Sequence, residues 1–247
     1  INGPAALGEP MDRLFCAIDN MELERACALT RQLRGTVGGI KLGLEFVIQH
    51  GEVGLADLAA LGMPLMVDAK ICEIPRFVGN VVRRLSAQGV SYVTIHAAIG
   101  GPGMRAAMAA AISGAEAGGC ARTKVIAATV LPGTSDEDLA ALGIQDGVEN
   151  EILRLAKLAQ DHGLDGVWAP ANTVKMLREH FGEEFLLVTP GIRPAWAPSD
   201  DQPHILTPGD AVRGGTDILV VGRPITRAKD PLDAARRIAE EATAAAL

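Results

Sequence analysis

Short apolar segments recur along the whole chain and are separated by longer segments with helical periodicity. Each apolar run has the length of a strand and is apolar throughout rather than at alternate positions, which is typical of strands buried on both faces of a parallel sheet. Eight such runs begin at Leu14, Gly38, Leu65, Tyr92, Lys124, Gly166, Leu186 and Ile218.

The segments between these runs have the pattern of amphipathic helices. In residues 150–160, and again after the Asp230-Pro231 pair, apolar side chains recur every three or four positions opposite charged ones. Eight strands alternating with helices predict an α/β fold, a single (β/α)8 TIM barrel over residues 11–247. Residues 1–10 contain glycine and proline without periodicity, which indicates a disordered tail or a cloning remnant.

Composition and charge narrow the class of partner. The chain is 48% hydrophobic but only 3% aromatic, so its core must consist mainly of Ala, Val, Leu and Ile. The formal charge of -7 and the absence of a Lys/Arg-rich run argue against a nucleic-acid partner. No run approaches the ~20 apolar residues that span a bilayer, and no secretory signal opens the chain, so we expect a cytoplasmic protein with small-molecule partners. The four cysteines are scattered, with no metal-ligand spacing, so no metal is expected.

Polar side chains stand at the ends of most of the predicted strands. In a barrel of this kind, the C-terminal ends of the strands and the loops after them form one mouth, where small molecules bind. The polar residues at these ends are Asp19, Lys41, Asp68, Lys70, His96, Arg193 and Arg223. We interpret His96 as a hydrogen-bonded packing residue and the others as candidates for a site.

The third apolar run ends in Asp68 and Lys70, and a second acidic residue, Glu73, follows it. The period of two along a strand directs Asp68 and Lys70 to the same face, and Glu73 follows where a helix begins. Lys41, at the end of the neighbouring strand, is expected beside them. Such a cluster is nearly neutral, so it could form in a partly buried site, either as a catalytic centre or as a salt-bridge network that only stabilises the fold.

A second signal follows the last two strands, where barrels commonly bind phosphate. Glycine-rich turns there contain Arg193 and the Gly222-Arg223 pair, and a planar guanidinium suits phosphate oxygens. Between them, residues 195–208 form a long polar loop that contains Gln202. Its length and position suit either a closing lid or an ordinary surface loop.

Five segments, taken together, resemble the orotidine 5'-monophosphate decarboxylase family, and the likeness runs from the first predicted strand to the last. They are residues 17–19 (AID), 40–43 (IKLG), 68–75 (DAKICEIP), 188–194 (VTPGIRP) and 220–224 (VVGRP). The resemblance implies a catalytic barrel that converts orotidine monophosphate to uridine monophosphate in pyrimidine biosynthesis, without a metal or organic cofactor.

The resemblance also implies roles for individual residues. Asp19 and Lys41 would contact ribose hydroxyls, and Lys70 would donate the proton to the pyrimidine carbon that loses carbon dioxide. The family is a homodimer, so Glu73 would reach into the neighbouring subunit's site. The residues implied to hold the phosphate are Arg193, Gln202, Gly222 and Arg223.

The chemistry of the implied reaction agrees with these residue types. Loss of carbon dioxide leaves a carbanion without an electron sink, so a cation and a proton source are needed beside that carbon. Lys70 could serve as both. Asp68 would lie near the substrate carboxylate and disfavour it relative to the transition state.

Several positions depart from the family pattern. Glu73 stands where the family has Asp, and Phe77 stands where it has Thr. Pro132 and Gly133 stand where the family has a Thr-Ser pair that contacts the pyrimidine. A shifted loop could let Thr134 or Ser135 make that contact instead. These departures leave two alternatives open. The chain could act on another phosphorylated carboxylate or sugar, as keto-gulonate phosphate decarboxylase does, or it could be a non-catalytic barrel that binds a phosphate ligand.

Overall fold

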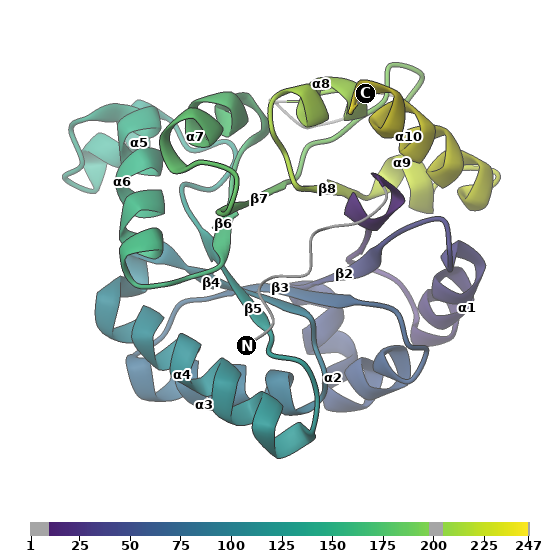
Figure 1. The fold of residues 1–247 in the computed structure, drawn as a ribbon, viewed down its shortest axis with the longest axis horizontal. Coiled ribbons are helices and arrows are strands. Elements are labelled where there is room, and N and C mark those ends of the chain that lie inside the picture. The colour runs from purple at the N-terminus through teal and green to yellow at the C-terminus, as the bar shows by residue number, and fades with distance from the viewer. Residues whose placement is uncertain (1–9, 198–204, 247) are drawn as a thin grey trace.

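The computed structural model describes residues 10–197 and 205–246, which fold into a closed barrel of eight parallel strands (Figure 1). The strands pair in chain order, and the last pairs with the first. They are β1 (Leu14–Ile18), β2 (Gly39–Gly43), β3 (Leu65–Ile71), β4 (Tyr92–His96), β5 (Lys124–Ala128), β6 (Gly166–Trp168), β7 (Leu186–Thr189) and β8 (Ile218–Val221). The predicted (β/α)8 barrel is confirmed, with one strand in each apolar run.

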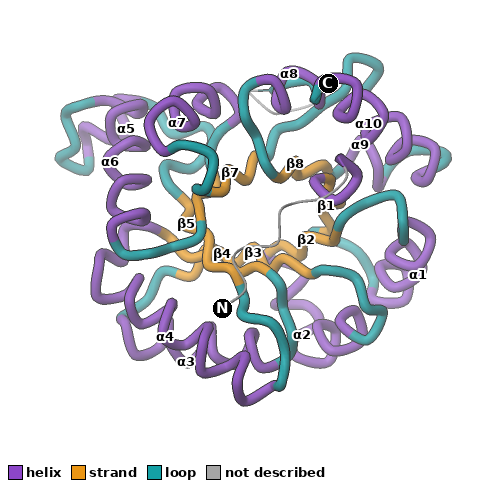
Figure 2. Tube along the Cα trace, in the orientation of Figure 1, coloured by secondary structure: helices purple, strands orange, loops and turns teal. Residues whose placement is uncertain are grey.

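Helices surround the ring of strands (Figure 2). They are α1 (Leu23–Leu33), α2 (Leu44–Ala59), α3 (Pro75–Ala87), α4 (Gly100–Gly118), α5 (Asp136–Ala141), α6 (Gly147–Asp161), α7 (Val174–Phe181), α8 (Pro208–Arg213), α9 (Arg223–Thr226) and α10 (Pro231–Ala245), with short 3-10 helices at Pro10–Arg13, Ala97–Ile99 and Ala171–Thr173. Of the predicted tail, residues 1–9 lie outside the described residues. Within the described ranges, no helix is long and apolar enough to cross a membrane.

Capping residues fix where the helices begin. Asp230 accepts the backbone N–H groups of Leu232 and Asp233, and Pro231 occupies the first turn, where its missing N–H has no cost. Both predicted helical segments are confirmed, since residues 150–160 lie within α6 and the Asp230-Pro231 pair starts α10.

The core has two layers, one inside the barrel and one between strands and helices. Along β1, Phe15 and Ala17 point into the barrel, whereas Cys16 and Ile18 pack against the helices. Inside the barrel, Phe15 meets the edge of Tyr92 with their ring centroids 5.5 Å apart. Because both faces of each strand are covered, the strands are apolar throughout, as the sequence pattern predicts.

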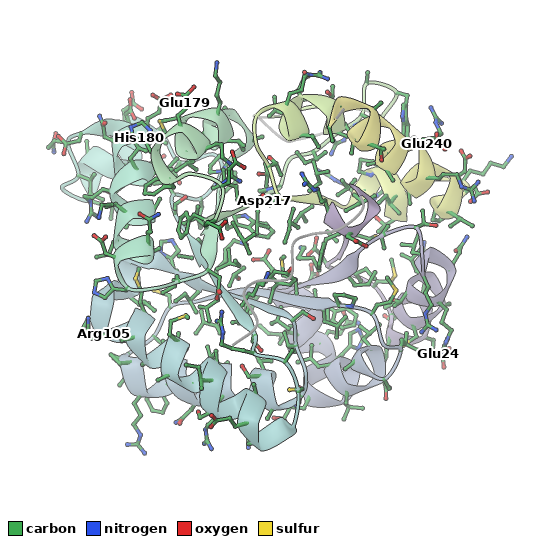
Figure 3. The ribbon with its side chains drawn as sticks, in the orientation of Figure 1. Glu24, Arg105, Glu179, His180, Asp217 and Glu240 are labelled. Atoms are coloured by element: carbon green, nitrogen blue, oxygen red, sulfur yellow. The ribbon has the colours of Figure 1, made fainter. Side chains whose placement is uncertain are left out.

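Ion pairs tie the loops together at the N-terminal end of the strands. Asp217, which precedes β8 and lies next to β7 and β8 in Figure 3, accepts the N–H of Leu187 and pairs with Arg178 at 2.5 Å. Burial raises the pKa of the Asp217 carboxyl, against the lowering effect of the Leu187 hydrogen bond and of Arg178. In barrels this end contributes stability, while the opposite end carries the site.

Candidate active site

A hollow of about 410 Å³ opens at the mouth formed by the C-terminal ends of the strands. Its lining comes from β1, β2, β6, β7 and β8 or the loops directly after them, and includes Asp19, Lys41, Trp168, Arg193 and Gly222. A volume of this size is within the range of roughly 300–1,000 Å³ that small-molecule sites occupy.

Four charged side chains form a continuous chain of ion pairs, of which the first two, Asp19 and Lys41, line this hollow. Lys41 Nζ lies 2.5 Å from Asp19 Oδ1 and 3.8 Å from Asp68 Oδ2. Lys70 Nζ donates to both carboxylate oxygens of Asp68, at 2.8 and 2.9 Å. Lys41 and Asp68 are only 6% and 5% exposed, so their charges are removed from water and depend on one another.

Close backbone packing brings Asp19 to this chain of charges. Gly43 ends β2, and a Cβ at this position would lie 2.1 Å from Asp19 Oδ1. Only glycine leaves room for the Asp19 carboxylate to reach Lys41. This close approach explains why the 40–43 segment ends in glycine.

The backbone at Lys70 departs from regular strand geometry. Its φ is +45°, and the pairing of β3 with β4 changes register between Val67 and Ile71. For a residue other than glycine this conformation costs roughly 1–3 kcal/mol. Asp68 and Lys70 do meet as predicted, but through an irregular end of the strand rather than through simple alternation.

Thr94 on β4 supports this irregular end and was not among the residues that the sequence pattern singled out. It is fully buried, its Oγ1 accepts the backbone N–H of Lys70 at 2.9 Å, and the same hydroxyl donates to Asp68 Oδ1 at 2.9 Å. A single side chain thus holds both charged residues in place. A period of two back from His96 could have identified it.

Trp168 at the end of β6 was also missed. Lys70 Nζ lies 4.7 Å from the centre of its ring, a distance at which the ring face attracts a cation. Asp68 and Lys70 do not line the hollow themselves, but each contacts a residue that does, Asp68 the ammonium of Lys41 and Lys70 the ring of Trp168.

Glu73 stays apart from this centre within the single chain. It is exposed, its Oε1 accepts the N–H of Ile74 at the start of α3, and among the described residues it forms no ion pair. The sequence pattern predicted that Glu73 would join a cluster with Lys41, Asp68 and Lys70. In the structure the second carboxylate of that cluster is Asp19.

Arginines gather at the opposite end of the hollow. Arg193 follows β7 and is 5% exposed, and its backbone N–H bonds to Leu206 O at 2.8 Å. Gly222 and Arg223 follow β8, and Arg223 begins α9. All three residues line the hollow, as expected from their strand ends.

The long loop after β7 is described only in part. Ile192 and Leu206 form a parallel bridge that joins its two ends, and Trp196 lies beneath the guanidinium of Arg237 at 4.3 Å. Gln202, which the family resemblance assigns to the phosphate, lies outside the described residues.

His96 is hydrogen-bonded at its strand end, in keeping with a packing role. Its Nδ1 accepts the N–H of Ala98 at 3.1 Å. Burial and the nearby charge of Lys70 lower its pKa, which favours the neutral ring. On β1, burial raises the pKa of the Cys16 thiol to about 12, which disfavours the reactive thiolate form.

Gly133, Ser135 and Phe77 belong to the segments that depart from the family pattern, and the structure shows what surrounds each of them. Gly133 has φ of +90° in a turn where Thr134 N–H bonds to Leu131 O, a conformation that favours glycine. Ser135 forms a capping box with Asp138 at the start of α5, so its hydroxyl is occupied there. Phe77 lies in the first turn of α3 and is 49% exposed, outside the lining of the hollow.

The fold and the site together define a barrel enzyme with a lysine–aspartate centre at one side of its mouth and an arginine-rich end at the other. The sequence pattern of the orotidine 5'-phosphate decarboxylase / HUMPS family matches residues 12–238. The chain therefore belongs to this family.

Individual relatives agree over nearly the whole length. The chain is 44% identical over 229 residues to an orotidine 5'-phosphate decarboxylase of Rhodospirillum rubrum, covering 92% of this chain and 93% of that protein. It is 42% identical over 228 residues to one of Paramagnetospirillum magneticum, covering 92% and 97%. A crystal structure of orotidine 5'-phosphate decarboxylase from Lactobacillus acidophilus matches with a TM-score of 0.81 at 32% identity, over 93% and 98% of the two chains.

Proposed function

We propose that this protein decarboxylates orotidine 5'-monophosphate (OMP) to uridine 5'-monophosphate (UMP) in the cytoplasmic synthesis of pyrimidines, without a cofactor. The observation that carries the proposal is the Lys70 ammonium, held by Asp68 at 2.8 Å beside a hollow that ends in arginines. The names and coverage of the relatives support the same substrate.

The proposed step needs one cation and one proton. The bond between the pyrimidine ring and its carboxylate breaks, carbon dioxide leaves, and the electron pair stays on the ring carbon. Lys70 Nζ stabilises this negative charge and transfers a proton to the carbon, which completes the C–H bond of UMP. The neutral amine then regains a proton from solvent.

Asp68 has two tasks in this proposal. It orients the Lys70 ammonium through two hydrogen bonds, and it lies where the substrate carboxylate must approach. Repulsion between the two carboxylates is relieved as carbon dioxide forms, so it favours the transition state over bound substrate. Lys41, 3.8 Å from Asp68, reduces the cost of keeping that buried carboxylate charged.

The remaining contacts bind parts of the substrate that do not react. Asp19 and Lys41 would receive ribose hydroxyls, and their place in the lining of the hollow supports this assignment. The residues proposed to hold the 5'-phosphate are Arg193, Gln202, Gly222 and Arg223. Binding energy from this distant phosphate would offset the crowding of charge at the reacting carbon.

We also propose a homodimer with shared sites. Ile74, Phe77 and Val81 are 56%, 49% and 41% exposed and recur at helical spacing on one face of α3, directly after Glu73. A second copy that covers this stripe would bury it and would bring Glu73 towards a neighbouring mouth. Sedimentation equilibrium at micromolar concentration tests this, and a monomer throughout would contradict it.

An ultraviolet assay of OMP loss tests the proposed activity. Purified protein treated with a chelator should convert OMP to UMP at an undiminished rate, because the proposed centre uses only side chains. Undetectable turnover together with binding of another phosphate ester would favour a different substrate. Phe77 and Gly133, which depart from the family pattern, are the residues that motivate this alternative. Stabilisation by ligands without any product would indicate a non-catalytic barrel.

A further inference from the structure

The first turns of α2 pack against the loop that brings Asp19 to the hollow. This loop, residues 19–22, connects β1 to α1, and three of its residues line the hollow, Asp19, Asn20 and Met21. Three hydrogen bonds join the loop to α2. Asn20 Nδ2 donates to Glu45 Oε1 at 2.6 Å, Gln49 Nε2 donates to Glu22 Oε1 at 3.3 Å, and His50 Nε2 donates to Met21 O at 2.9 Å.

The bond from His50 is the one that fixes the backbone of this loop. The other two join exposed side chains, which can exchange their partners for water at little cost. Met21, by contrast, is only 8% exposed, and His50 is partly buried. Because a carbonyl oxygen only accepts, His50 must carry a proton on Nε2. A shielded bond to a main-chain oxygen thus restrains the path of the loop itself.

The sequence around His50 holds its ring in this direction. The ring centroid lies 4.5 Å from that of Phe46, which is fully buried one turn earlier. Gly54, one turn later, leaves room for His50, since a Cβ there would lie 2.4 Å from the His50 Cβ. Gly51 follows directly with φ of +58° and ψ of -152°, so α2 kinks at this point. Two glycines and one aromatic contact therefore direct a side chain that lies outside the lining of the hollow.

Asp19 depends on this restraint because burial does not hold it. Its side chain is 52% exposed and pairs with Lys41 at 2.5 Å. Met21 is only two residues further along the chain, so a shift of the Met21 backbone would move Asp19 as well. Binding groups displaced by about 1 Å can lose much of their effect.

We infer that His50 is a positioning residue for substrate binding, which fixes the loop of Asp19 through Met21 O and thereby sets the affinity for the ribose. The inference rests on the proposed function, in which Asp19 receives a ribose hydroxyl. His50 does not contact the substrate and takes no part in proton transfer at Lys70. Its loss should therefore weaken binding more than it slows the chemical step.

Steady-state kinetics of His50→Phe test the inference. Phenylalanine keeps an aromatic ring against Phe46 but cannot donate to Met21 O. We expect KM for OMP to rise about tenfold, the effect of one lost hydrogen bond, while kcat falls less than about threefold. His50→Gln, whose amide can donate from a similar reach, should return KM to within about threefold of the wild type.

His180→Phe is the matched control. His180 of α7, labelled in Figure 3, also lies beside a phenylalanine ring and bonds to a backbone carbonyl, that of Met176 at 2.8 Å. It lies outside the lining of the hollow, so KM and kcat should stay within about twofold of the wild type. Should His50→Phe not fold, His50→Asn takes its place with the same expected rise in KM, because its amide is too short to reach Met21 O.

A double-mutant cycle with Asp19→Ala separates positioning from a general loss of stability. If His50 acts through Asp19, His50→Phe should raise KM by less than about twofold in the Asp19→Ala background. An equal rise in both backgrounds, or an unchanged KM in His50→Phe, would overturn the inference.

Ribose 5-phosphate and inorganic phosphate, measured by calorimetry, make the test independent of turnover. His50→Phe should weaken binding of ribose 5-phosphate about tenfold and leave that of inorganic phosphate within about twofold, because only the former has hydroxyls for Asp19. A wild-type protein that shows this dependence but does not turn over OMP would sink only the proposed function. Normal OMP turnover, with ribose 5-phosphate binding that His50→Phe leaves unchanged, would sink only this inference.

Discussion

Lys70 illustrates how much a single residue here depends on its neighbours. Its positive φ is unfavourable, and its ammonium is directed by Asp68 and by the face of Trp168. Thr94 links these features, because its hydroxyl bonds to the Lys70 backbone and to the Asp68 side chain. The geometry of the centre therefore rests on one buried hydroxyl that takes no part in the chemistry.

Replacing Thr94 tests this dependence. Thr94→Val keeps the shape but leaves the partly buried Lys70 N–H without a partner, at about 1–3 kcal/mol, and removes one of the two hydrogen bonds to Asp68 Oδ1, which Lys70 Nζ still contacts. We expect kcat for OMP to fall roughly ten- to a hundredfold while KM changes less, since the distant phosphate contacts remain.

Thr94→Ser is the matched control and should restore kcat to within about threefold, because it retains the hydroxyl. Steady-state kinetics of both variants supply the measurement. A Thr94→Val enzyme with unchanged kcat, or one whose KM alone rises, would show that the hydroxyl does not position the centre.

The residue scale is also where sequence reasoning reaches its limit. Charged residues at strand ends are conspicuous, so Asp19, Lys41, Asp68 and Lys70 could be predicted from the sequence. Thr94 shares a strand face with His96, but neither Thr94 nor Trp168 is charged, so neither is conspicuous within an apolar strand. Their importance arises from the register between strands that are far apart in sequence, and no local pattern encodes that register.

At the scale of elements, α3 and α4 pack closely against each other. Gly114 of α4 faces the backbone of α3, where an added Cβ would lie 2.4 Å from Arg83 O. Gly118 makes a similar approach to Ala87 O, at 2.3 Å. By contrast, a Cβ on Gly79 of α3 would meet only ordinary contacts, the nearest at 3.7 Å from Ala106 O. Small residues thus set the distance between these helices.

Two alanine substitutions at this helix pair should change stability in opposite directions. Gly114→Ala forces the helices apart and should destabilise the fold by roughly 1–3 kcal/mol. Gly79→Ala should stabilise it by about 0.5–1 kcal/mol, because alanine loses less backbone freedom in a helix. Thermal unfolding of both variants beside the wild type measures the shifts, and shifts in the same direction would contradict this packing.

Elements were more predictable than their ends. Every apolar run became a strand because burial on both faces demands continuous apolar sequence, and the Asp230 cap marked the start of α10. The fifth run continues to Leu131, yet β5 ends at Ala128. A turn with Gly133 at positive φ follows, and this turn depends on the tertiary path of the chain rather than on local propensity.

At the scale of the whole molecule, barrel closure is what makes a site from scattered residues. Asp19 and Lys41 from the first two strands meet Arg193 and Arg223 from the last two around one hollow, because β8 pairs with β1. Closure could be predicted from eight strands and their helices. The sequence of one chain could not place Glu73, since its proposed target lies on another copy.

Turnover of OMP by Lys70→Ala is the most direct test of the central claim, that this ammonium stabilises and protonates the carbon left by carbon dioxide. The account predicts a fall of at least about a thousandfold compared with the wild type, with UMP binding changed by less than about tenfold, because the arginine-rich end is intact. A variant that binds UMP normally and keeps turnover within tenfold of the wild type would contradict it.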